Sequence, residues 1–181
     1  LKCFARTCLF ASRHKFLLLD FAMGLLKGLD PLLTADLLHM LRSAGHGDSI
    51  VVVDCNFPAV EVASKTTTGK LVQIAGADDV AVIDAICSVL PLDYFVDDPV
   101  LHMVPSPGNE LPPLGKEVHA QVFDAIRKHS PDVQPKPIDR FAFYEKARTG
   151  FAVVQTMERR PYGCFILTKG VVGPDGKDLK P

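Results

Sequence analysis

Short apolar runs rich in β-branched residues alternate along the 181-residue chain with segments of helical periodicity. The clearest of these runs is Ser49 to Val53, whose continuous apolar character is typical of a strand covered on both faces. Further strands are predicted at residues 71–74, 100–104, 151–156 and 164–168. Helices are predicted at residues 35–44, 78–90, 115–129 and 140–149. This alternation favours an α/β fold in which a central sheet lies between two layers of helices.

The last two predicted strands are joined by a connection that contains a turn at Pro161, Tyr162 and Gly163. Because strands this close in sequence commonly form a hairpin, we expect them to pair with each other in the antiparallel sense. With 48% hydrophobic residues, the chain is long enough for one well-packed core and short for two. The predicted fold is therefore a single-domain, three-layer α/β/α sandwich with a mixed central sheet.

Composition divides the chain into three parts. Residues 1–22 carry four basic side chains against one acidic side chain, which resembles an organellar transit peptide. An upstream translated extension explains the same segment, because Met23 immediately precedes the first globular pattern. Residues 23–172 form the predicted domain, and the polar tail at 173–181 is expected to be frayed. The expected location is cytoplasmic, or organellar if residues 1–22 are a transit peptide.

Several classes of function are disfavoured by composition. A formal net charge of −1 without blocks of like charge argues against nucleic-acid binding and favours a small neutral partner. The five cysteines form no CxxC pair and are odd in number, which is typical of a reduced intracellular protein. The histidines show no close metal-ligand spacing, and the apolar run at 16–19 is too short to span a bilayer. We therefore expect no metal, no other cofactor and no membrane partner.

A histidine between two glycines precedes the first strand, and a carboxylate follows that strand. Imidazole and carboxylate exchange protons near neutral pH, so His46 and Asp54 could face one crevice as a compact acid/base site. Asp54 also lies at the carboxyl end of its strand, where open α/β sheets place ligand groups. A second interpretation stays open: Gly45 fits the left-handed position that ends the preceding helix, and His46 would then interact only with the helix dipole.

Two tyrosines add phenol groups to the candidate chemistry. Arg140 and Tyr144 lie four residues apart in a predicted helix and therefore share one face, where a guanidinium could orient the phenol or lower its pKa. A surface arginine beside a half-buried tyrosine explains the same spacing. Tyr162 presents its phenol from a turn, where it could pack or bind a ligand. Taken alone, Asp93 is typical of a turn and Met103 of a core.

Five short motifs follow one another in this order: Gly45-His46-Gly47-Asp48, Asp54-x-Asn56-Phe57-Pro58, Leu90-Pro91-Leu92-Asp93, Arg140-Phe141-x-Phe143-Tyr144-Glu145 and Tyr162-Gly163. As an ordered set they resemble the fucose mutarotase branch of the RbsD/FucU family, from about Met23 to Val172. The resemblance implies an RbsD-like sandwich that self-associates, as a dimer up to a decamer. It also implies an enzyme that interconverts the α and β anomers of L-fucose. D-ribose, the substrate of a sister branch, and non-catalytic monosaccharide binding are the alternatives.

The resemblance also implies roles for single residues. His46 would be the proton donor, with Asp48 as its orienting group, and Tyr144 would be a second acid/base or binding group. The implied sugar contacts are Asp54, Asp93, Met103, Arg140 and Tyr162. Cys164 stands where the family usually has asparagine, and a thiol cannot replace a carboxamide that both donates and accepts hydrogen bonds. We expect Cys164 to change sugar affinity or choice if the side chain of that asparagine holds a hydroxyl.

Overall fold

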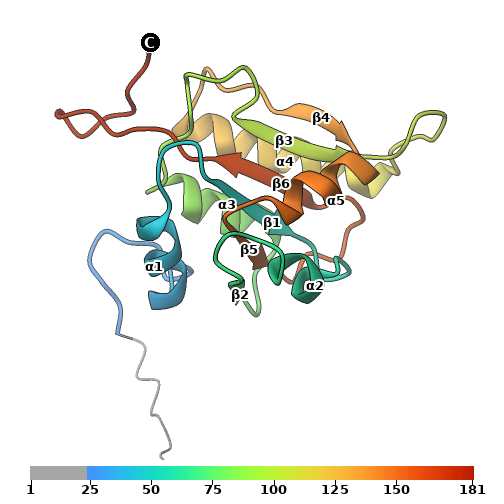
Figure 1. Ribbon diagram of the computed structural model, residues 1–181, viewed down its shortest axis with the longest axis horizontal. Helices are drawn as coiled ribbons and strands as arrows, with labels where there is room; N and C mark the ends of the chain where they lie inside the picture. The colour runs from blue at the N-terminus through green and yellow to red at the C-terminus, as the bar shows by residue number, and fades with distance from the viewer. Residues whose placement is uncertain (1–23) are drawn as a thin grey trace, which may run out of the picture.

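The structure, a computed structural model, describes residues 24–181 (Figure 1). The predicted leader at residues 1–22 lies outside the described residues. The helices of the described part are α1 (Ala35–Ser43), α2 (Ala59–Ala63), α3 (Asp79–Cys87), α4 (Pro113–His129) and α5 (Arg140–Arg148). Its strands are β1 (Ser49–Val53), β2 (Leu71–Gln73), β3 (Val100–Val104), β4 (Lys136–Asp139), β5 (Ala152–Gln155) and β6 (Cys164–Thr168). Within residues 24–181, no helix has the length and apolar character needed to cross a membrane.

The six strands form one mixed sheet in the order β2-β5-β1-β6-β3-β4. β6 runs antiparallel to both of its neighbours, β1 and β3, whereas the other adjacent pairs are parallel. β1 lies near the middle of the sheet, and residues 50–53 are fully buried. The α/β class and the mixed sheet predicted from the sequence are therefore confirmed.

The expected hairpin between the last two strands is wrong. β1 lies between β5 and β6, so these two strands do not pair with each other. The connecting segment at 156–163 crosses the carboxyl end of β1, where the backbone N–H of Thr156 donates to the carbonyl of Val53 at 2.9 Å. The buried backbone of β1 needs hydrogen-bond partners along both edges, and β5 and β6 supply one each.

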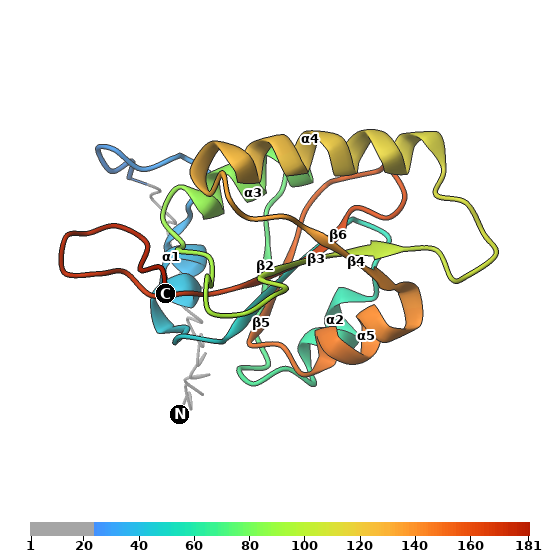
Figure 2. The same cartoon turned by 90° about the horizontal axis from the view of Figure 1, so that it is seen from above.

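Helices cover both faces of the sheet (Figure 2). α3 and α4 lie on one face, and α2 and α5 lie on the other. Because successive residues of a strand point to opposite faces, Ile50 and Val52 pack with α3 and α4, whereas Val51 and Val53 pack with α2 and α5. This arrangement is the predicted three-layer α/β/α sandwich.

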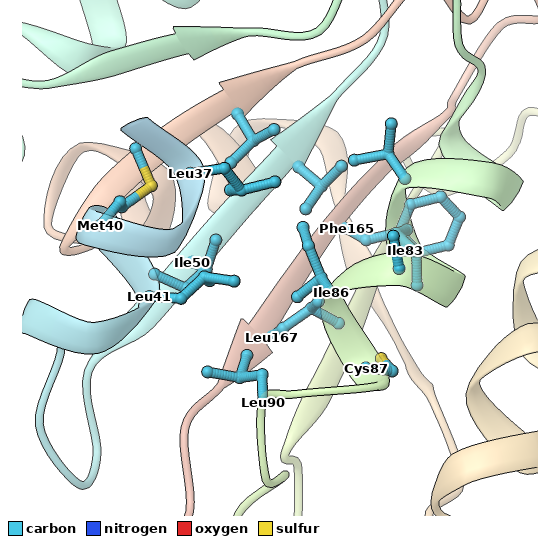
Figure 3. Close-up of a cluster of buried hydrophobic side chains, with 14 of the residues drawn as sticks. Leu37, Met40, Leu41, Ile50, Ile83, Ile86, Cys87, Leu90, Phe165 and Leu167 are labelled. Atoms are coloured by element: carbon cyan, nitrogen blue, oxygen red, sulfur yellow. The ribbon is translucent and has the colours of Figure 1, made fainter. Parts of the chain in front are cut away.

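α1 packs into the same cluster as α3 and α4. Its side chains Leu37, Met40 and Leu41 are buried, and Figure 3 shows Leu37 and Leu41 close to Ile50 of β1 and Ile86 of α3. Burial of each leucine side chain contributes roughly 1.5–3 kcal/mol. This packing holds the end of α1 against the sheet and so places the turn at residues 45–48.

Three helices begin where the sequence predicts. The side chains of Thr34, Asp78 and Asp139 accept hydrogen bonds from backbone N–H groups in the first turns of α1, α3 and α5, respectively. Each of these side-chain oxygens satisfies a backbone donor that the helix leaves free, which is worth about 1 kcal/mol. The Asp139 cap also carries the chain directly from β4 into α5.

Three features differ from the sequence prediction. α2 has only five residues, and no helix was predicted there. β4 contains Pro137, which disfavours a strand but is tolerated here because β4 lies at the edge of the sheet. The tail at 173–181 is not frayed, since the backbone N–H of Leu179 donates to Val171 and Lys180 lies over the ring of Tyr94.

Candidate active site

The carboxyl ends of β1, β3 and β4 meet at one end of the sheet and form a pocket of about 300 Å³. In Figure 1 this end lies on the right, beside α2 and α5. The pocket brings together six residues that the sequence singled out, namely Asp54, Met103, Arg140, Tyr144, Tyr162 and Cys164. Asp54 follows β1, Arg140 follows β4, and Cys164 begins the antiparallel strand beside β1. The topology therefore assembles most of the predicted sugar-binding residues in one chain.

Asp54 is a buried acceptor at the base of this pocket, with 6% of its surface exposed. One carboxyl oxygen accepts from the backbone N–H of Asn56 at 2.9 Å, and the other from the thiol of Cys164 at 3.5 Å. Burial raises the pKa of Asp54 above its ordinary value in spite of these hydrogen bonds. Burial and the neighbouring Asp54 also raise the pKa of Cys164 well above normal, so this thiol stays neutral and donates.

Tyr144 is held at the pocket by two contacts of its ring, one with an aromatic side chain and one with a cationic side chain. Its ring stacks on Phe57, with the centroids 5.1 Å apart and the planes inclined by 11°. The guanidinium carbon of Arg140 lies 5.8 Å from the Tyr144 centroid, within the range of a cation–π contact. The predicted proximity of Arg140 and Tyr144 is confirmed, and the contact involves the ring.

Tyr162 adopts a strained backbone conformation. Its φ of +66° is in the left-handed region, and it is the only non-glycine residue of the described chain with positive φ. Gly163 follows in a tight space, since a Cβ there would lie 2.3 Å from Oδ2 of Asp79 and 2.8 Å from Cγ of Glu158. Asp79 is itself buried and accepts from the hydroxyl of Thr156 at 2.7 Å. The turn that presents Tyr162 is therefore closely packed.

His46 lies at the opposite end of the sheet, in the turn between α1 and β1. β1 spans roughly 17 Å at about 3.3 Å per residue, and His46 precedes it while Asp54 follows it. The expectation that both side chains face one crevice of the same chain is therefore wrong. The physical reason is that residues before and after a strand emerge at opposite edges of the sheet.

The partner of His46 is Asp93. Nε2 of His46 lies 3.1 Å from Oδ2 of Asp93, whose side chain is buried while that of His46 is half exposed. The other oxygen of Asp93 accepts from the backbone N–H of Phe95 at 2.9 Å, and the ring of Phe95 meets His46 edge-on. Asp48, predicted to orient His46, instead accepts from the backbone of Gly45 at 2.7 Å. Asp93 therefore orients the imidazole and does not join the Asp54 pocket.

The helix-end interpretation of Gly45 is also wrong. α1 ends at Ser43, and Ala44, which follows it, is extended, with φ −65° and ψ 139°. The left-handed residue of this segment is Gly47, with φ +83°, inside the turn that follows. His46 is therefore carried by a turn between two elements, where its side chain is free to reach Asp93.

Comparison with known proteins decides the family. Residues 27–172 match the model of the RbsD / FucU transport protein family. The chain belongs to this family. A fucose mutarotase of Danio rerio is 36% identical over 155 residues, which cover 84% of this chain and 98% of the relative. An L-fucose mutarotase of Actinobacillus pleuropneumoniae is 33% identical over 147 residues, which cover 81% and 97%.

Several solved structures share the fold. The crystal structure of the fucose mutarotase from Streptococcus pneumoniae in complex with L-fucose aligns with a TM-score of 0.72 and 30% identity, over 82% of this chain and all of that one. The protein Atu2016 aligns with a TM-score of 0.75 and 43% identity, over 83% and 98%. RbsD of Bacillus subtilis complexed with D-ribose aligns with a TM-score of 0.61 over 82% and 100%, but at 18% identity it supports the fold alone.

Two buried histidines next to the pocket were not predicted from the sequence. His102 of β3 and His119 of α4 lie with their ring centroids 4.6 Å apart, and Phe123 packs against both. Nε2 of His119 lies 2.9 Å from the carbonyl oxygen of Tyr162. Each histidine occupies an apolar face of its element, and such a position carries no local signal of a contact 43 residues away.

The buried His102 predicts a pH dependence of stability. Burial, with a smaller effect of His119, lowers the pKa of His102 from 6.5 to about 4. Between these pH values the unfolded chain binds a proton that the folded chain does not, so the free energy of unfolding falls as pH is lowered through this window. Denaturant unfolding at several pH values is expected to show wild type losing stability relative to His102→Phe.

The same comparison removes the effect of other groups. The pKa of the buried Asp79 is raised, so its folded form keeps a proton that the unfolded form releases, and its contribution has the opposite slope. Because both proteins contain Asp79, this contribution cancels in the difference. A difference between wild type and His102→Phe that stays constant as pH falls would contradict the assignment of a neutral, buried His102.

Proposed function

We propose that this protein is a mutarotase that interconverts the α and β anomers of L-fucose. The observation that carries the proposal is the match to fucose mutarotases over 97–98% of their own length, at 33–36% identity. The geometry agrees with this chemistry, because a pocket of about 300 Å³ joins a carboxylate, a guanidinium and two phenols beside aromatic rings. Hydroxyl-rich, uncharged ligands require such a combination of hydrogen-bonding groups and apolar surface.

Mutarotation requires only the movement of protons. The ring oxygen gains a proton while the anomeric hydroxyl loses one, so the ring opens to the aldehyde. Rotation of the carbonyl and closure on its other face give the second anomer. We assign His46 as the donor of the proton to the ring oxygen. Tyr144 or a water serves the anomeric hydroxyl as it loses its proton, and Asp54 accepts a hydrogen bond from a sugar hydroxyl. Each acid/base group contributes about 10²- to 10⁴-fold in rate.

The His46–Asp93 contact selects the nitrogen that acts. Because the carboxylate of Asp93 accepts at Nε2, Nδ1 is the nitrogen left for the sugar. Asp93 is thus a positioning residue, and its role in this proposal replaces the role expected for Asp48.

A complete site requires a second copy of the chain. His46 and Asp93 lie at one end of the sheet and the Asp54 pocket lies at the other, so one copy supplies only half of the acid/base set at each end. Exposed apolar side chains flank both ends, with Phe95 and Val172 near His46 and Phe141 near the pocket. We propose a homo-oligomer in which the His46 end of one copy covers the Asp54 pocket of another.

The proposed location is the cytoplasm. Cys55, Cys87 and Cys164, the cysteines of the described part, are all free thiols. Free buried thiols persist in reducing compartments. Import into an organelle is the alternative if residues 1–22 act as a transit peptide, and fusion of these residues to a fluorescent protein distinguishes the two.

Anomer exchange measured by saturation-transfer NMR tests the proposal. With a catalytic concentration of protein, exchange between the anomers of L-fucose is expected to accelerate, and D-ribose and other monosaccharides on the same panel should respond less. Binding is measured on the same sample. Binding of L-fucose without faster exchange would overturn the enzyme and favour a monosaccharide-binding protein, and a stronger response to D-ribose would reassign the substrate.

A further inference from the structure

We propose that His119 is a positioning residue that holds Tyr162 in the orientation in which its phenol contacts the sugar. The inference rests on the proposed function and on the sugar contact that the family resemblance implies for Tyr162, which lines the pocket. His119 belongs to α4 and does not line the pocket, whereas Tyr162 does. The only polar contact between His119 and the site is the hydrogen bond to the carbonyl oxygen of Tyr162, among the contacts of the described residues.

The chemistry of this hydrogen bond defines the state of His119. A carbonyl oxygen only accepts, so Nε2 of His119 must carry the proton across the 2.9 Å contact. Burial lowers the pKa of His119 below its ordinary value, and its side chain is 4% exposed. The imidazole is therefore neutral near pH 7, with hydrogen on Nε2 and none on Nδ1.

The backbone of Tyr162 needs such support. A tyrosine at φ +66° is in a region that costs free energy for any residue with a Cβ, and it persists only where the surroundings enforce it. The flanking residues are enclosed as well: a Cβ at Gly115 of α4 would lie 3.1 Å from the carbonyl oxygen of Pro161, and one at Gly163 would meet Asp79. The side chain of Tyr162 packs against the cluster around Phe57, and the His119 hydrogen bond restrains its backbone.

The donor is held rigidly by its neighbours. The ring of His119 packs against His102, Phe123 and Phe165, with centroid distances of 4.6, 5.9 and 5.5 Å. These contacts fix the plane of the imidazole and hence the direction of the N–H bond. The rigidly held N–H of His119 fixes the carbonyl group of Tyr162. This hydrogen bond opposes a rotation of the Tyr162 peptide that would carry the phenol away from the pocket.

Kinetics of matched His119 variants test this role. His119→Phe removes the donor and keeps the ring, so the KM for L-fucose is expected to rise about three- to tenfold while kcat changes less than about twofold. His119→Gln can still donate to the carbonyl and is expected to keep KM near the wild-type value. His119→Asn is too short to reach it and should behave like His119→Phe.

A double-mutant comparison separates positioning from general packing. If His119 acts through Tyr162, then His119→Phe adds no further increase in KM in a Tyr162→Phe background. Equal increases in both backgrounds, or a His119→Gln variant as impaired as His119→Asn, would overturn the proposal. If His119→Phe does not fold, the KM values of His119→Gln and His119→Asn are compared instead, and only the Asn variant is expected to show a raised KM. A wild-type protein without anomer exchange contradicts the proposed function alone, and L-fucose affinity then replaces KM as the readout.

Discussion

Replacement of His46 by alanine is expected to lower the acceleration of L-fucose anomer exchange by about 10²- to 10⁴-fold, the usual contribution of a general acid. The loss follows because no other described residue at this end of the sheet carries an imidazole against a buried carboxylate. The fold should survive, since the His46 side chain is half exposed and lies on a turn. Saturation-transfer NMR measures the exchange, and circular dichroism with a thermal midpoint checks the fold.

Two aspartates provide a matched control for His46. Asp93→Asn keeps the shape of the side chain but replaces a carboxylate, which can only accept at Nε2 of His46, with an amide that can also donate, so the imidazole loses its fixed orientation and exchange should fall. Asp48→Asn keeps an acceptor for the backbone N–H of Gly45 and should have a much smaller effect. Unchanged exchange in His46→Ala would remove His46 from the mechanism, and a larger loss in Asp48→Asn than in Asp93→Asn would reverse their roles.

Two inactive variants are expected to regain about a quarter of wild-type activity when His46→Ala and Asp54→Asn chains are refolded together in equal amounts. The reason is the separation of the two residues at opposite ends of β1. If each site takes His46 from one copy and Asp54 from another, random mixing pairs two intact halves at about one site in four. The measurement is anomer exchange in the mixed sample relative to each variant alone.

A second mixture controls for this recovery. His46→Ala and Asp93→Asn alter the same half of the site, so mixing them creates no site with both residues intact. Recovery with Asp54→Asn but not with Asp93→Asn would support a site shared between copies. Absence of recovery in both mixtures, in samples whose mass in solution shows a mixed oligomer, would contradict the shared site.

Local sequence patterns predicted the bounds of those strands in which nearly every residue is buried. The strands at 49–53, 100–104 and 164–168 have the predicted bounds, because continuous apolar runs end at turn residues. β4 was missed because Pro137 disfavours a strand, and the edge position that tolerates it is a property of the sheet order. The hairpin was predicted wrongly for the same reason, since the choice of a pairing partner is not encoded next to the strand.

The sequence by itself determined the α/β class and the helix caps, because these depend on periodicity and on side-chain type. Residues such as Met103 and Cys164 were expected at the pocket only through the resemblance of the ordered motifs to a family. The tertiary structure decided that His46 and Asp54 lie at opposite ends of the sheet, that Asp93 partners His46 and that His119 holds Tyr162. These contacts join residues 43 to 47 positions apart. They arise from packing of whole elements against the sheet, which no local pattern specifies.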